Sequence, residues 1–333
     1  MCAMKVEIKD AAFGYKKYNL FEHLNVVVPA QSVLTILGPN GVGKTTLLRC
    51  MMGFLPWREG ATYFNDKPLS SYSHRELWSH MSYVPQAKQS PFGYSVLDTV
   101  VMGLNATAGV FSTPSKDDYE KALETLDWLG ISDIARSNCN EISGGQLQMT
   151  LIARALVSKP EVLILDEPES NLDMRNQLLV MDAIKRVTAS RSTTCIINTH
   201  FPEHAFMVSD NTLFVGHENV RLHGETLTVI NEENIRRFYG VNARIVDVSV
   251  ADATREEAPH AQSETPDAED VRVSATSEKH AVLDDANNVH ESNGCAGEGK
   301  SVEHSSCAAA ASVDAAKTHA HERCVFPYAL AQS

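Results

Sequence analysis

The sequence has no apolar run long enough to cross a membrane. A spanning helix needs roughly 18 to 20 consecutive apolar residues, and every apolar stretch here is much shorter. The first residues, MCAMKVEIKDAAFGY, also lack the apolar segment of a secretion signal. We therefore expect a soluble, cytoplasmic protein.

The chain also lacks a basic stripe and closely paired cysteines. Its formal net charge is −13, with 29 Lys+Arg against 42 Asp+Glu, so we expect no nucleic acid as a partner. The seven cysteines contain no C-x-x-C pair. This scatter favours reduced thiols over a metal or disulfide framework.

Residues 251–333 contain few of the apolar residues that a core needs. They hold 15 Asp+Glu and 6 Lys+Arg and are rich in Ala and Ser. Such a segment cannot bury enough apolar surface to offset chain entropy, so we expect a disordered tail. Its six histidines leave metal capture or regulated docking as an alternative, but only His319 and His321 lie close together.

Residues 4–240 alternate strand and helix patterns, as an α/β domain does. The apolar runs VLTIL, VLILD and CIIN are typical of parallel strands covered on both faces. MKVEIKD alternates instead and predicts an antiparallel portion near the N-terminus. Ser115 and Gly130 bound a predicted helix, and NTLFVGHENVRLHGE predicts a closing hairpin that turns near Glu218 and Asn219. Residues 241–250 are expected to end the fold.

The stretch GPNGVGKT fits the pattern G-x-x-x-x-G-K-[ST] between a buried strand and a helix. In such a loop the backbone amides cradle phosphates, Lys44 reaches the β and γ oxygens, and the Thr45 hydroxyl ligates Mg²⁺. The strand-loop-helix context makes a chance match improbable. The predicted nucleotide-binding residues are Gly38, Pro39, Asn40, Gly41, Val42, Gly43, Lys44, Thr45 and Thr46.

Two carboxylates follow the apolar strand in VLILDEP. Open α/β sheets bind ligands at the carboxyl ends of their strands, so we expect Asp166 to hold the same Mg²⁺ through a water. Glu167 is placed to polarise a water for attack on the γ-phosphate as a general base. A solvated strand end is the alternative, and the phosphate-binding loop GPNGVGKT, called the P-loop below, argues against it.

Three further polar features follow or precede predicted elements. Gln86 follows a probable strand, and His200 ends the apolar stretch CIINTH. On spacing alone, each is either a ligand of the phosphate or metal or a structural residue. The stretch Ser143–Gln146, SGGQ, precedes a helical pattern and is typical of a second anion-binding loop.

Taken in this order, the P-loop, Gln86, SGGQ, LILDEP and the strand that ends in His200 resemble the ATP-binding subunit of ABC transporters over nearly all of residues 4–240. The resemblance implies a P-loop NTPase cassette. This fold has a mixed-sheet, RecA-like core, an antiparallel β subdomain and a helical subdomain at about residues 88–160. It also implies an ATP hydrolase that uses ATP and Mg²⁺.

The resemblance implies a role for each matching residue. Tyr15, with Tyr18 as the fallback, stacks on adenine, while Gln86 meets Mg²⁺ or the attacking water. Glu167 is the hydrolytic base and His200 contacts the γ-phosphate. The signature and dimer-contact residues, which meet the ATP or surface of a second copy, are Ser143, Gly144, Gly145, Gln146 and Asp173.

The sequence departs from the family pattern directly after the signature and also at Leu104. Leu147 and Met149 stand where the family usually has arginines, and Leu104 replaces another arginine. The segment around YSVLDTVVMG nevertheless looks most like importers of the iron-siderophore, haem, cobalamin and molybdate type.

That branch implies a set of partners and a location. The partners are a second copy in a head-to-tail dimer, integral membrane permease subunits and, indirectly, a solute-binding protein. The chain would then lie on the inner face of the cell membrane through the permease. A non-transport ABC ATPase acting on the ribosome or DNA remains an alternative, although one cassette without coiled-coil or zinc inserts argues against it. A separate-chain exporter is also left open.

Overall fold

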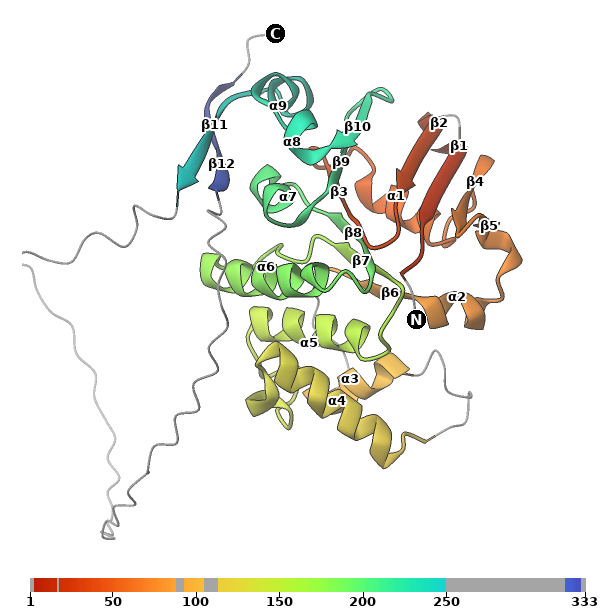
Figure 1. Ribbon diagram of the computed structural model, residues 1–333, viewed down its shortest axis with the longest axis vertical. Helices are drawn as coiled ribbons and strands as arrows, with labels where there is room; N and C mark the ends of the chain where they lie inside the picture. Colours follow the sequence, from red (N-terminus) through yellow and green to blue (C-terminus); the bar gives the residue numbers. More distant parts are fainter. Residues whose placement is uncertain (1–2, 17, 88–92, 105–112, 250–320, 331–333) are drawn as a thin grey trace, which may run out of the picture. The chain divides into compact units, whose positions relative to one another are not determined.

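The computed structural model describes residues 3–16, 18–87, 93–104, 113–249 and 321–330 (Figure 1). These described residues belong to one compact unit. Within the described ranges, no helix is long and apolar enough to cross a membrane.

A six-stranded sheet forms the centre of the fold, in the order β10-β9-β3-β8-β7-β6 (Figure 1). Its strands are β3 (Val33–Leu37), β6 (Met81–Val84), β7 (Val162–Asp166), β8 (Thr194–Asn198), β9 (Asn211–Val215) and β10 (Arg221–Glu225). All pairs are parallel except β9 with β10. Every residue of β3, β7 and β8 is buried, as their continuous apolar runs predicted.

The closing hairpin has the turn that the sequence predicted. Glu218 and Asn219 have φ values of 53° and 63°, both in the left-handed region. Two consecutive left-handed residues match the twist of antiparallel strands and so connect β9 to β10 tightly.

A second, antiparallel sheet has the order β2-β1-β4-β5. Its strands are β1 (Val6–Tyr15), β2 (Tyr18–Val28), β4 (Glu59–Phe64) and β5 (Lys67–Pro68). Helix α1 (Lys44–Met51) packs with this sheet in one hydrophobic cluster, which also contains Leu34, Ile36 and Ile164 of the central sheet. The start of α1 is therefore fixed from two sides.

A group of helical elements packs on the two sheets: the first contacts β4 of the antiparallel sheet, and two others contact β6 of the central sheet. The elements are η1 (Leu69–Ser71), α2 (His74–His80), α3 (Val96–Val101), η2 (Met102–Leu104), α4 (Lys116–Leu129), η3 (Ser132–Ile134), α5 (Gly144–Leu156) and α6 (Met174–Ala189). Helix α4 begins and ends as predicted: the Ser115 side chain accepts from the Asp118 amide, and Gly130 is left-handed with φ 75°.

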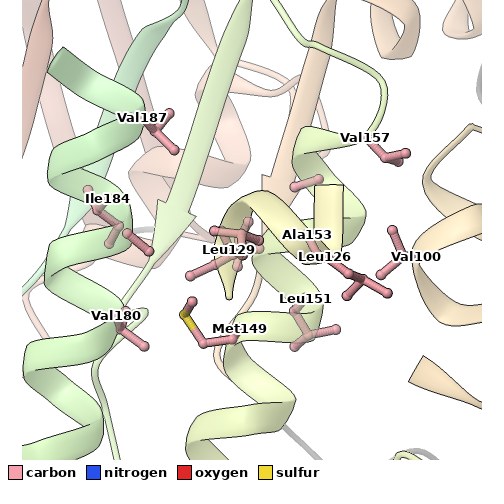
Figure 2. Close-up of a cluster of buried hydrophobic side chains, with 14 of the residues drawn as sticks. Val100, Leu126, Leu129, Met149, Leu151, Ala153, Val157, Val180, Ile184 and Val187 are labelled. Atoms are coloured by element: carbon pink, nitrogen blue, oxygen red, sulfur yellow. The ribbon is translucent and has the colours of Figure 1, made fainter. Parts of the chain in front are cut away.

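Apolar residues of α3, α4, α5 and α6 form one core (Figure 2). Met149 lies in this cluster, and Leu147 does too; the two are 7% and 8% exposed. The family's usual arginines at these two positions are thus replaced by side chains that stabilise the attachment of α5 through apolar burial.

The C-terminal part of the fold adds an element that the sequence did not predict. After α7 (Pro202–Val208), α8 (Thr226–Val229) and α9 (Glu232–Tyr239), β11 (Val241–Ser249) pairs antiparallel with β12 (His321–Leu330). Val325 packs against the cluster that contains Phe214 and Ala205. The expectation of a disordered tail was therefore wrong for residues 321–330, while residues 250–320 lie outside the described residues. The expected domain boundaries stay a prediction.

Candidate nucleotide site

The loop Gly38–Gly43 has a backbone that requires glycine. Gly38 has a φ of 152°, and a Cβ there would lie 2.0 Å from the backbone oxygen of Val215. Gly43 has a φ of 101°, and a Cβ would lie 2.5 Å from the side chain of Leu20. A residue with a Cβ is therefore excluded at positions 38 and 43, and glycine lets the loop turn tightly before α1, whose N-terminus favours an anion.

Lys44 is buried at the first position of α1, with a side chain 4% exposed. Its Nζ donates to the carbonyl oxygens of Gly38 at 2.8 Å and Pro39 at 3.1 Å and lies 3.9 Å from Glu167 Oε1. Burial lowers the pKa of Lys44, and nearby carboxylates, Glu167 first, oppose that shift. The ammonium group is thus held at the mouth of the phosphate loop by groups that a phosphate can replace.

Asp166 lies at the end of β7 and accepts hydrogen bonds from three different elements. Thr45 Oγ1 donates to Asp166 Oδ1 at 3.1 Å, and Asn198 Nδ2 donates to the same oxygen at 2.5 Å. The Tyr83 hydroxyl donates to Oδ2 at 3.1 Å. Burial, and then the charge of Asp166, raises the pKa of Tyr83, so the phenol stays a donor.

The sequence analysis did not identify Asn198 or Tyr83 as site residues. Asn198 is fully buried and stands opposite Asp166 in the register of β7 and β8. A polar residue at the end of the apolar run CIIN was the available signal, because a buried amide needs a partner.

Gln86 and Asp166 line a cavity of about 460 Å³ together with Thr45 and Tyr83. The hydroxyl, carboxylate and amide oxygens are the hard ligands that Mg²⁺ prefers. The three residues predicted to hold Mg²⁺ therefore face one space, and the donor set fits this ion.

Glu167 has an unusual backbone for its residue type, with a φ of 48°. Its amide donates to the Asn198 carbonyl oxygen at 2.9 Å, and Ser170 Oγ donates to its Oε2 at 3.1 Å. A left-handed non-glycine residue costs free energy and persists where surrounding bonds enforce it. Those bonds turn the carboxylate back towards Lys44.

His200 follows β8 and lies in a short loop before α7. Its Nδ1 is buried and has no hydrogen-bond partner among the described residues. The Tyr239 hydroxyl donates to the His200 carbonyl oxygen at 3.3 Å. The centroid of the His200 ring lies 4.0 Å from that of Phe201. Because β7 and β8 are neighbours, His200 and Glu167 leave the same edge of the sheet.

The signature residues lie at the start of α5. Ser143 caps this helix: its Oγ accepts from the Gln146 amide at 3.2 Å, and Gln146 Oε1 accepts from the Ser143 amide at 2.9 Å. Asp173 caps α6 in the same way by accepting from the Asn176 amide at 2.8 Å. In the described part of the chain, no hydrogen bond of Ser143–Gln146 reaches the P-loop. The described polar contacts therefore link the P-loop to Asp166 and Glu167, while those of the signature stay within α5 and its cap.

Tyr15 and Tyr18 face each other at the turn between β1 and β2. Both rings are accessible, at 52% and 60% exposed. Tyr15 is steadied by an edge contact with Phe13 at 5.1 Å. Either ring is free to stack on a flat base.

A glycine loop that ends at a helix start, a buried lysine and a carboxylate at the end of β7 define a P-loop nucleoside triphosphatase. The comparisons with known proteins narrow this class. Residues 21–170 match the family model described as ABC transporter.

Two bacterial relatives cover most of the folded part. The molybdate import ATP-binding protein MolC of Haemophilus influenzae is 33% identical over 70% of this chain and 87% of its own length. An ATP-binding protein of Helicobacter pylori assigned to iron chelatin transport is 34% identical over 71% of this chain and 93% of its own.

A solved structure agrees with these relatives. It is described as an inward-facing conformation of a metal-chelate type ABC transporter. It has a TM-score of 0.66 and 30% identity over 74% of this chain and 92% of the matched chain. The chain belongs to the family of ABC transporter ATP-binding proteins and, as a member, binds and hydrolyses ATP.

Proposed function

We propose that this chain energises a multi-subunit importer for a metal chelate or a molybdate-type oxyanion. The observation that carries the proposal is the group formed by Lys44, Asp166 and Glu167 in a cassette of the ABC family. The names of the molybdate and iron chelatin relatives, and of the metal-chelate type structure, support the cargo class.

In this proposal the P-loop amides and Lys44 bind the ATP phosphates, while Tyr15 stacks on the adenine. Thr45, Gln86 and Asp166 hold Mg²⁺, which supplies charge neutralisation at the phosphate oxygens when bound. Glu167 takes a proton from the attacking water.

His200 leaves the same sheet edge as Glu167, and we assign it a contact with the γ-phosphate.

A head-to-tail dimer completes the proposed site. The helix start at Ser143–Gln146 is capped by its own side chains, and none of its described hydrogen bonds reaches the P-loop of its own chain. A helix start of this kind favours an anion. We assign it to the ATP of a second copy, with Asp173 beside it at the dimer contact and permease subunits as the coupled membrane partners.

Glu167→Gln tests the chemistry. The amide is similar in size to the carboxylate but cannot take a proton, so ATP binding is expected to persist while hydrolysis stops and an ATP-dependent dimer accumulates. Phosphate release and size-exclusion chromatography measure the two effects. Hydrolysis at the normal rate would show that another group is the base.

Ser143→Arg in the Glu167→Gln background tests the dimer. A large cation at the signature is expected to block the ATP-dependent dimer without weakening ATP binding by the monomer. Ser115→Arg is the matched control, since Ser115 caps α4 with the same box geometry outside the signature. Equal loss of the dimer in both variants would reduce the signature to a helix cap.

Uptake by cells tests the transport role. Cells that carry Glu167→Gln in place of the wild-type chain are expected to lose uptake of radiolabelled iron chelate or molybdate. Normal uptake of both, with hydrolysis lost, would favour the non-transport or exporter alternatives.

A further inference from the structure

Glu169 is a buried carboxylate that the proposed chemistry does not use. It lies two residues after Glu167, and none of its surface is exposed. A carboxylate in the interior is costly unless polar groups compensate it. Its contacts therefore indicate why the fold keeps it.

The two direct polar contacts described for Glu169 lie on the His200 side of the site, and its charge also raises the pKa of the buried Lys44, against the larger effect of burial. The Thr199 hydroxyl donates to Glu169 Oε1, and His204 Nδ1 lies 3.5 Å from the same oxygen. Thr199 directly precedes His200, and His204 lies in the first half of α7. Glu169 Oε2 is buried and has no hydrogen-bond partner among the described residues.

The Thr199 hydroxyl also shapes the loop that carries His200. It accepts from the Phe201 amide at 3.2 Å, while the Thr199 amide donates to the Ile36 carbonyl oxygen at 3.1 Å. The residues on both sides of His200 are therefore tied to one hydroxyl group. That hydroxyl group is held in turn by Glu169.

We propose that Glu169 is a positioning residue, which fixes the His200 loop relative to Glu167 through the Thr199 hydroxyl. The inference rests on the proposed contact of His200 with the γ-phosphate. The short segment Glu167–Glu169 thus contains the proposed base, Glu167, and also positions the proposed phosphate contact, His200, through Glu169. Misplacement of a site group by 1 Å costs on the order of 10²-fold in rate. The gain in rate from a fixed His200 loop therefore offsets the free-energy cost of burying the Glu169 carboxylate.

The experiment measures steady-state ATP hydrolysis and ATP affinity for the full chain. Glu169→Ala is expected to lower kcat by about tenfold or more and to leave the Kd for ATP within about twofold, because the P-loop contacts are untouched. Glu169→Gln keeps an oxygen acceptor for Thr199 and is expected to recover most of the kcat. A fall in ATP affinity equal to the fall in kcat would overturn the proposal.

Substitutions of Thr199 test the link itself. Thr199→Val removes the hydroxyl group and is expected to reproduce the loss of kcat, whereas Thr199→Ser keeps it and is expected to restore activity. The double variant Glu169→Ala/Thr199→Val is expected to be no worse than either single variant, as for two parts of one link. If Glu169→Ala does not fold, the contrast between Val and Ser decides, and equal kcat values for the two would overturn the proposal.

Two further variants separate the possible failures. Glu161→Gln is the matched control: Glu161 also pairs with a histidine, His80 at 2.9 Å, but it precedes β7 at the opposite end from the site. Its kcat is expected to be unchanged. A loss of kcat equal to that of Glu169→Ala would show that both variants act through general stability.

The variant His200→Ala separates failure of the inference from failure of the proposed function. If His200→Ala abolishes hydrolysis and Glu169→Ala does not affect it, the positioning role fails while the proposed function stands. If His200→Ala hydrolyses ATP normally, the assignment of His200 fails, and the inference fails with it.

Discussion

Asn198 gives the sharpest quantitative prediction about the site. Its amide donates to Asp166 Oδ1 at 2.5 Å from a position with no exposed surface. Asn198→Leu replaces the side chain by an apolar group of similar size and removes one of the two donors to that oxygen. The other donor is Thr45 at 3.1 Å.

The expected cost follows from the charge on the acceptor. A hydrogen bond to a charged group contributes about 1.5–3 kcal/mol. Asn198 Oδ1 has no partner among the described residues, so its removal leaves no acceptor-side loss and places the cost near the lower end, about 2 kcal/mol. For a domain of this size that corresponds to a fall in melting temperature of about 4–8 °C.

Thr212→Val is the matched control for Asn198→Leu. Thr212 Oγ1 lies 3.0 Å from Thr226 Oγ1 and is equally buried, but both groups are neutral. Loss of a neutral hydrogen bond is expected to cost about 1 kcal/mol. Thermal unfolding followed by circular dichroism measures both variants, and Asn198→Leu is also expected to slow ATP hydrolysis. Equal shifts in the two variants would refute the reasoning that a charged acceptor makes the Asn198 bond stronger.

Three other predictions concern an ion pair, two thiols and a close helix contact. Burial alone would raise the pKa of Asp210, but hydrogen bonds from Arg191 at 2.6 and 2.9 Å and from a backbone amide outweigh it and lower the pKa. The stability that the Arg191–Asp210 pair contributes is present above the pKa of Asp210 in the unfolded chain. It is lost as the pH falls through the lower pKa of the folded state. Asp210→Asn should therefore lower the melting temperature at neutral pH, and a difference that persisted in strong acid would contradict the assignment. Burial raises the pKa of Cys50 and Cys195 to about 12 each, so neither thiol should react with a thiol reagent before unfolding, and mass spectrometry of labelled peptides would reveal early reaction. Gly145→Ala places a Cβ 2.3 Å from Asn176 and should cost about 1–3 kcal/mol in thermal unfolding. The same change at the preceding glycine, Gly144, meets nothing closer than 3.6 Å and should cost much less.

The central sheet was predictable because local sequence determines much of it. Continuous apolar runs predicted the buried strands β3, β7 and β8, and a serine and a glycine predicted both ends of α4. The order of motifs resembled one family, and the comparisons confirmed that resemblance. The roles of the individual site residues remain predictions.

The strand β12 could not be predicted, because its partner is distant in sequence. Residues 321–330 have no strong pattern of their own and form a strand by pairing with β11. Strand pairing depends on neighbouring strands and burial more than on intrinsic preference. Composition described the average of residues 251–333 and missed this short segment.

The sequence by itself determined the phosphate loop, since its glycines, Lys44 and Thr45 all lie in one short segment, GPNGVGKT, whose conformation depends on local backbone geometry. Only the tertiary structure decided which polar groups meet at Asp166 and around His200. Asn198, Tyr83 and Glu169 reach these positions from separate strands and loops, and nothing local in the sequence links them. The physical reason is that a buried polar group is satisfied by whichever partner the packed sheet brings within hydrogen-bonding distance, and that choice is made between elements distant in the chain.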